Sequence, residues 1–148
     1  SSETFYVPEL DYTFTFDAKG VHVGDAAQTM MNFSLRYEPI KKLYFKVQYQ
    51  FFDRYYASFN PFELQGEKGG RDAWKLPSYN LMNIFAGYSF KIRKVNVFSN
   101  ITLTNVLNAK YIADADDAIL GSMNSDAQSA RVMFGQGFRF NASLGVNF

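Results

Sequence analysis

The sequence predicts an all-β chain whose antiparallel strands cross a membrane as part of a transmembrane β-barrel. Three observations lead to this fold class. Several segments alternate apolar and polar residues at every second position, and no segment shows helical periodicity. Aromatic residues make up 18% of the chain, including 16 Phe and 10 Tyr, which is more than one soluble core of this size needs. The connections between the alternating segments are short and long in turn.

The clearest predicted strand lies at the end of the chain. Residues 138–148 are apolar at every even position and polar or small at every odd position. This length is enough to cross a bilayer as a tilted strand, which takes about 9–11 residues. The other segments with this alternation are 31–38, 43–51, 82–90, 95–104 and, more weakly, 12–17. We therefore expect about six strands.

The connections predict which way the strands run. Segments 38–42 and 92–94 are short, whereas 53–79 and 105 to about 135 are long, polar and rich in Gly, Asn and Asp. Outer-membrane barrels have short periplasmic turns and long extracellular loops. We therefore expect the last strand to run toward the periplasm, with Phe148 as the natural end of the protein. We expect the two long connections to lack regular structure.

The composition of the two strand faces predicts which face meets lipid. The polar positions carry mostly Asn, Ser, Thr, Gln and Gly, whereas a strand facing solvent usually carries Lys and Glu. These polar groups can hydrogen-bond to one another and to water across a lumen. Rings near the strand ends, such as Tyr37 and Tyr88, suit the aromatic girdles at membrane interfaces. We therefore expect the apolar positions to face outward into lipid.

A series of short motifs runs in order along nearly the whole chain. They are GVHVGDAAQ (20–28), LRYEP (35–39), YQFFDRYYASF (49–59), WKLPSY (74–79), GYSF (87–90), NVLN (105–108), YIADA (111–115) and FGQG (134–137), followed by the aromatic end of the sequence. In this order they resemble TonB-dependent receptors of the Bacteroides type. The resemblance implies a barrel of about 22 strands whose lumen holds an N-terminal plug. Residues 1–148 would supply about the last six strands, so that the plug and the earlier strands are absent from them.

The same resemblance implies a function in transport. It places the protein in the bacterial outer membrane, importing a nutrient of the siderophore, corrinoid, glycan or peptide class with energy from the TonB system. The implied partners are outer-membrane lipid, the remaining strands and plug of the same receptor, the TonB system and the barrel-assembly machinery. Nucleic acid is not an expected partner because the formal net charge is only +1. About six strands cannot close a barrel, since small barrels begin at about eight.

Three sets of residues are candidates for function. Aromatic and Arg residues in the long connections are candidates for ligand contact, or for packing between loops: Arg54, Tyr55, Tyr56, Phe59, Arg71, Trp74, Tyr111 and Met133. Polar strand residues are candidates for contact with the plug or for lining the substrate path: Arg36, Lys46, Gln48, Gln50, Asn83, Asn100, Thr102, Arg139 and Asn141. The last strand carries the candidate barrel-assembly signal: Phe140, Ala142, Leu144, Val146 and Phe148.

Neither catalysis nor a cofactor is expected. The chain has no cysteine and one histidine, His22, so a catalytic triad or a transition-metal site would have a single imidazole available. Asp114, Asp116 and Asp117, with Asp126 nearby, could supply oxygen ligands to calcium, but their spacing matches no EF-hand, and we expect a solvated acidic loop. Two alternatives remain open: a small stand-alone outer-membrane barrel acting as an anchor or adhesion module, and a soluble β-sandwich that binds a ligand.

Overall fold

The computed structural model describes residues 2–7, 12–17, 19–22, 24, 26–58, 70, 72–116 and 130–148. Within them the chain is all-β with antiparallel sheets and no helix, as the sequence predicts. These residues accordingly include no helix long and apolar enough to span a membrane. The chain divides into two compact units: a loop unit (1–28, 53–77 and 112–134) and a sheet unit (29–52, 78–111 and 135–148).

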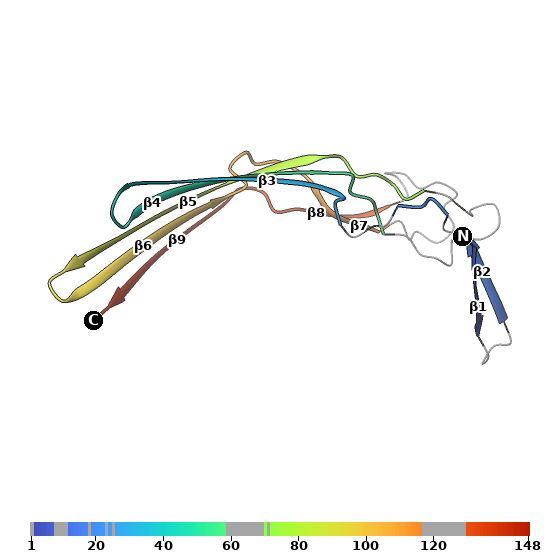
Figure 1. Ribbon diagram of the computed structural model, residues 1–148, viewed down its shortest axis with the longest axis horizontal. Helices are drawn as coiled ribbons and strands as arrows, with labels where there is room; N and C mark the ends of the chain where they lie inside the picture. Colours follow the sequence, from blue (N-terminus) through green and yellow to red (C-terminus); the bar gives the residue numbers. More distant parts are fainter. Residues whose placement is uncertain are drawn as a thin grey trace. The chain divides into compact units, whose positions relative to one another are not determined.

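The sheet unit is one five-stranded antiparallel sheet (Figure 1). Its strands, in spatial order, are β3 (Thr29–Ile40), β4 (Leu43–Asp53), β5 (Tyr79–Ile92), β6 (Val95–Thr104) and β9 (Arg139–Asn147). They coincide with the five segments in which the alternation of the sequence is strongest. These five predicted strands are therefore confirmed.

The strand register places the apolar positions of neighbouring strands on one face. Phe45 pairs with Ala86, Ala86 pairs with Ile101, and Ile101 pairs with Ala142. Because side chains alternate between faces along each strand, the rows above and below continue the same apolar face. Large apolar side chains of the sheet that remain exposed include Met31, Phe33, Leu35, Tyr37, Phe45, Tyr88, Ile101, Phe140 and Leu144. This face therefore covers no core within the described part of the chain.

On the polar face, glycines leave room for rings of the neighbouring strand. Gly145 pairs with Phe98, and a Cβ atom at Gly145 would overlap the Phe98 ring. Gly87 pairs with Tyr44, and a Cβ atom at Gly87 would likewise overlap the Tyr44 ring. An aromatic ring that lies over a strand glycine replaces the packing that the missing side chain would provide. Both glycines are therefore required by the rings beside them.

We expect Gly145→Val to lower the free energy of unfolding by about 1–3 kcal/mol, the usual cost of adding a side chain to filled space. Ser143→Val is the matched control, because Ser143 lies two residues away on the same face of β9 and pairs with Asn100. Urea unfolding followed by circular dichroism compares the two variants. Equal stability would show that the Phe98 ring moves aside without cost.

Two-residue turns at one end of the sheet join β3 to β4 and β5 to β6. They consist of residues 41–42 and 93–94, and the backbone N–H of Ser89 donates to the carbonyl of Lys42 (2.9 Å). Lys42 has φ +71° and Arg93 has φ +55°. Glycine and asparagine adopt these left-handed values at lower cost than other residues. We call this end of the sheet the turn end.

The loop unit contains two hairpins and the best buried side chains. β1 (Ser2–Val7) pairs with β2 (Tyr12–Asp17), and β7 (Ile112–Asp116) pairs with β8 (Arg131–Phe134). Isolated bridges add contacts within the unit, from Tyr56 to Lys75 and from Ser58 to Asp116. The buried apolar side chains of the described chain are Tyr55, Tyr56, Ala57, Ala73, Leu76 and Ala115. The core that the structure describes thus lies among the long connections.

The strand predicted at 12–17 is confirmed, but it pairs with β1 in a separate two-stranded sheet and does not join the five-stranded sheet, so the expected row of six strands is wrong. The connection after residue 105 was expected to lack regular structure, yet it contains β7 and β8. β7 has little strand propensity of its own, because it alternates acidic residues with alanines. Outside contacts hold it, including the Ser58 N–H, which donates to the Ala115 carbonyl (2.8 Å).

Candidate functional site

The polar face of the sheet gathers the residues that the sequence predicts to face the lumen. Gln48 pairs with Asn83, and Thr102 pairs with Asn141. The remaining residues of the set lie on the same face by register or by side-chain contact: Arg36, Lys46, Gln50, Asn100 and Arg139. The nine side chains therefore share one face. Their contact with a plug or a substrate stays a prediction.

Neutral amide groups link the strands across this face. The Gln48 side-chain amide donates to Asn32 Oδ1 (3.2 Å), which joins β4 to β3. The Asn83 amide donates to Gln50 Oε1 (3.4 Å), which joins β5 to β4. Each of these amides can both donate and accept hydrogen bonds. Such a surface suits uncharged, hydrogen-bonding groups or water more than it suits ions.

A hollow of ≈ 260 Å³ opens on the polar face near the turn end. Its lining includes Arg36, Glu38, Lys42, Tyr44, Ser89 and Asn100. The Tyr44 hydroxyl donates to Asn100 Oδ1 (3.4 Å). The Arg36 guanidinium lies 4.3 Å from the centre of the Tyr44 ring and forms an ion pair with Glu38 (2.6 Å). Because Glu38 already neutralises Arg36, the hollow does not present an open arginine to an anion.

Sequence reasoning left Glu38 and Tyr44 out of the candidate set. Both stand at polar positions of the alternation, so their face was predictable from sequence. Their contacts were not, because the hollow depends on how β3, β4 and β6 align. The set should therefore be extended to these two side chains.

At the end of the sheet opposite the turns, Asn105 joins three segments. Its side chain is buried, with 4% exposed. The Asn105 amide Nδ2 donates to the carbonyls of Ala109 (2.9 Å) and Gln136 (2.9 Å), and its Oδ1 accepts from the Ala109 N–H (2.9 Å). The Asn105 backbone N–H donates to Asn83 Oδ1 (3.0 Å). The first asparagine of the NVLN motif thus fixes the connection after β6 and orients Asn83 on the polar face.

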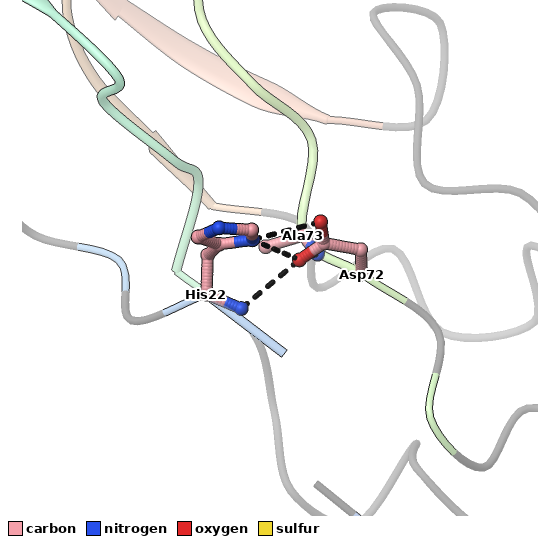
Figure 2. A network of polar contacts seen from close by, with 3 residues as sticks. All are labelled: His22, Asp72 and Ala73. Carbon is pink, nitrogen blue, oxygen red and sulfur yellow. Dashed lines mark hydrogen bonds and ion pairs between the residues drawn. The ribbon is translucent and has the colours of Figure 1, made fainter. Parts of the chain in front are cut away.

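In the loop unit, His22 and Asp72 form a contact between segments that are 50 residues apart (Figure 2). The His22 backbone N–H donates to Asp72 Oδ1 (3.0 Å), and the ring Nδ1 lies 2.8 Å from Oδ2. The Ala73 N–H also donates to Asp72 Oδ1 (2.9 Å). The imidazole stacks flat on the Tyr56 ring, with 4.1 Å between centres. A carboxylate at Nδ1 fixes the orientation of an imidazole ring.

This contact controls the charge of Asp72. Burial raises the pKa of Asp72, but hydrogen bonds from the backbone and ring of His22 and from the Ala73 N–H outweigh burial, so that the pKa lies below its ordinary value. The carboxylate is therefore the favoured form in the folded chain. Sequence reasoning considered His22 only as a lone imidazole and missed Asp72, since no local pattern joins two residues so far apart.

We expect the loop unit to loosen in acid because of this carboxylate. The folded pKa is the lowered one, so the stability from Asp72 is present above the unfolded pKa of about 3.9 and is lost as pH falls through the folded pKa. Asp72→Asn should show a smaller acid transition below about pH 4 than the wild type. Fluorescence of Trp74, the single tryptophan, measures it. Glu38→Gln is the control, and an equal change in both variants would contradict the assignment.

Several predicted ligand-contact residues pack inside the loop unit. Tyr55 and Tyr56 are buried, and the Tyr55 hydroxyl donates to the Ala113 carbonyl (3.0 Å). Trp74 is half-buried, and its carbonyl accepts from the Ala57 N–H (2.8 Å). The Tyr55 side chain therefore links the two long connections, and packing between loops is the alternative that the sequence left open beside ligand contact. Trp74 contributes a backbone contact within its own connection.

The other predicted contact residues are spread more widely. Tyr111 belongs to the sheet unit and stacks on Tyr79, with 4.4 Å between ring centres. Arg54 and Met133 are exposed in the loop unit. Phe59 and Arg71 lie outside the described residues. Ligand contact by members of this set stays a prediction.

The acidic cluster is only partly described. The Asp114 carboxylate accepts from the N–H of its neighbour in β7, and Asp116 pairs with Arg131 (3.4 Å). Asp117 and Asp126 lie outside the described residues. In the described part of the chain, no group of three or more His, Asp or Glu side chains could hold a metal ion.

The candidate assembly signal lies on β9. Phe140, Ala142, Leu144 and Val146 stand on the apolar face of the sheet and are exposed. Recognition of this strand by an assembly machinery stays a prediction. Comparison of the chain with known protein families, curated proteins and solved structures found no match.

Proposed function

We propose that this chain supplies strands to a β-barrel in a bacterial outer membrane, as part of a TonB-dependent receptor that imports a nutrient. The observation that carries the proposal is the exposed apolar face of the five-stranded sheet. Leu144 is 70% exposed there and Leu35 is 72% exposed. Soluble proteins seldom expose a contiguous apolar surface that spans several strands. Lipid is an environment in which such a face is stable.

The polar atoms of this face support the proposal. Ser99 stands among the apolar side chains, and its hydroxyl donates to the Tyr88 carbonyl (3.4 Å). Its hydrogen-bonding group is therefore satisfied within the sheet. In lipid an unsatisfied polar group costs several kcal/mol, so such local pairing is required. The opposite face, with its linked amides, suits a water-filled or plugged lumen.

The edges of the sheet support a larger assembly. β3 and β9 are the outermost strands, and neither has a further partner strand among the described residues. An open strand edge is not tolerated in lipid, because its backbone groups would lack hydrogen-bond partners. We infer that the remaining strands of the same barrel pair with β3 and β9. The plug would then contact the polar face of the sheet.

The test is the behaviour of the native protein during extraction. A receptor should remain in membranes after an alkaline wash, require detergent, and run on gels as a heat-sensitive species several times larger than 16.9 kDa. A heat-sensitive native species of 16.9 kDa would favour the small stand-alone barrel instead. Protein that stays dispersed in water without detergent would overturn the membrane proposal.

A further inference from the structure

Five basic side chains gather at the turn end of the sheet. They are Lys41, Lys42, Lys91, Arg93 and Lys94, and all are exposed. We call this set the basic rim. None of the five forms an ion pair with an acidic residue in the described chain. The two turns come to the same end because β4 and β5 are antiparallel neighbours. The charges of the rim are therefore open to a partner.

The backbone at the rim shows that basic residues stand where other residues would fit at lower cost. Lys42 and Arg93 occupy left-handed conformations in two-residue turns, with φ +71° and +55°. Strain of this kind persists where the residue is needed for more than the fold. Two separate turns carry the same feature, each with a cation at the strained position. Turn geometry alone favours Gly or Asn at these two positions, so the shared feature of Lys42 and Arg93 that the turns do not explain is their charge.

The rim borders the apolar face of the sheet. Ile92 pairs with Val95 next to the second turn, and Ile92 is 55% exposed. Tyr88 is also exposed and pairs with Leu43 next to the first turn. An exposed apolar face edged by cations matches the cross-section of an anionic lipid layer, with acyl chains beside the strands and phosphates beside the turns. At the opposite end of the sheet, Asp53 and Arg139 are the charged residues at the strand ends, with Arg54 next to β4 and Lys110 in the connection after β6, so the described chain has no comparable group of five cations there.

We propose that the basic rim binds the phosphate headgroups of anionic phospholipids in the leaflet next to the turns. The proposal rests on the proposed membrane location and adds to it a lipid preference. Lys and Arg attract anionic headgroups within about one Debye length, so salt should weaken the preference. Each basic residue near the headgroups contributes roughly fivefold in affinity.

The test uses the protein at its full natural length in nonionic detergent. It is mixed with dioleoyl phosphatidylglycerol or dioleoyl phosphatidylcholine, and native mass spectrometry counts the lipids retained. The wild type should retain phosphatidylglycerol at least about tenfold better, and 0.5 M salt should reduce this ratio. The double variant Lys42→Gly and Arg93→Gly should lose at least about tenfold in phosphatidylglycerol retention.

Glycine relieves the positive-φ strain, so the double variant should unfold no more easily than the wild type. Lost lipid retention then cannot be assigned to misfolding. Lys110→Gln with Arg131→Gln removes the same charge outside the rim and should leave retention unchanged. The exchange Lys42→Arg with Arg93→Lys keeps the charge and should also retain the lipid.

Two outcomes would overturn the proposal that the basic rim binds anionic lipids, while leaving the proposed membrane location intact. One is equal retention of both lipids by a protein that needs detergent. The other is an equal loss in the rim variant and in its charge-matched control. Protein that stays dispersed without detergent would overturn the membrane location and the rim together.

Discussion

Asn105→Ala should lower the free energy of unfolding by about 3–4 kcal/mol. The substitution removes three side-chain hydrogen bonds at a buried position and leaves the carbonyls of Ala109 and Gln136 without this donor. Each unsatisfied buried group costs about 1–3 kcal/mol. The backbone adds to the cost, because Asn105 has φ +49°, a value that asparagine adopts more readily than alanine. Chemical unfolding followed by circular dichroism measures the loss.

Two further variants separate the causes. Asn105→Gly accepts the positive φ and loses only the hydrogen bonds, so it should be more stable than Asn105→Ala by about 1 kcal/mol. Asn96→Ala removes an exposed asparagine from β6 and should change stability by less than about 0.5 kcal/mol. If Asn105→Ala were as mild as Asn96→Ala, the network around Asn105 would not hold the connection after β6.

In the proposed membrane barrel, Ile101→Arg should destabilise the folded protein by about 2–4 kcal/mol. Ile101 stands on the apolar face, in the row that joins Phe45, Ala86 and Ala142. A charged residue near the bilayer midplane carries this cost because its desolvation is not compensated. In a soluble sheet, an exposed arginine at such a position would change stability by less than about 0.5 kcal/mol. Unfolding of the protein from lipid vesicles by guanidinium gives the difference.

Thr102→Arg is the matched control for Ile101→Arg. Thr102 is the next residue of β6 and stands on the polar face, where it pairs with Phe85 and Asn141. In the proposed barrel this face lines the lumen, where an arginine remains hydrated and should be tolerated. The prediction therefore concerns a difference between two adjacent residues. A larger cost at Thr102 than at Ile101 would reverse the assignment of the two faces.

The five-stranded sheet was predictable from sequence because its strands have strict period-2 alternation. In segment 82–90, for example, apolar Met82, Ile84 and Ala86 fix the face of every intervening residue. Short turns then restrict the register of β3 with β4 and of β5 with β6. The pairing of Gln48 with Asn83 joins β4 to β5 across a long connection, so the alternation predicts the face of each residue but not this register.

The loop unit was not predictable in the same way. β7 and β8 are separated by residues 117–130, and no local pattern indicates that they pair. The stacking of His22 on Tyr56 depends on segments that meet only after folding. The sheet unit has one contact of the same kind: the NVLN motif was visible in the sequence, but the role of Asn105 requires Gln136 and Asn83 to be brought together. Side chains whose partners are distant in sequence carry little local information about their contacts.

The position of Trp74 gives the protein an internal optical probe. Its indole is the only one in the chain, and it belongs to the loop unit, where the residue is half-buried beside the Tyr55 and Tyr56 segment. The sheet unit, in contrast, contributes tyrosines but no indole. Excitation selective for tryptophan therefore reports on the long connections alone. A candidate nutrient that binds to these connections would change the tryptophan emission without any added label. The five-stranded sheet would contribute no tryptophan signal of its own.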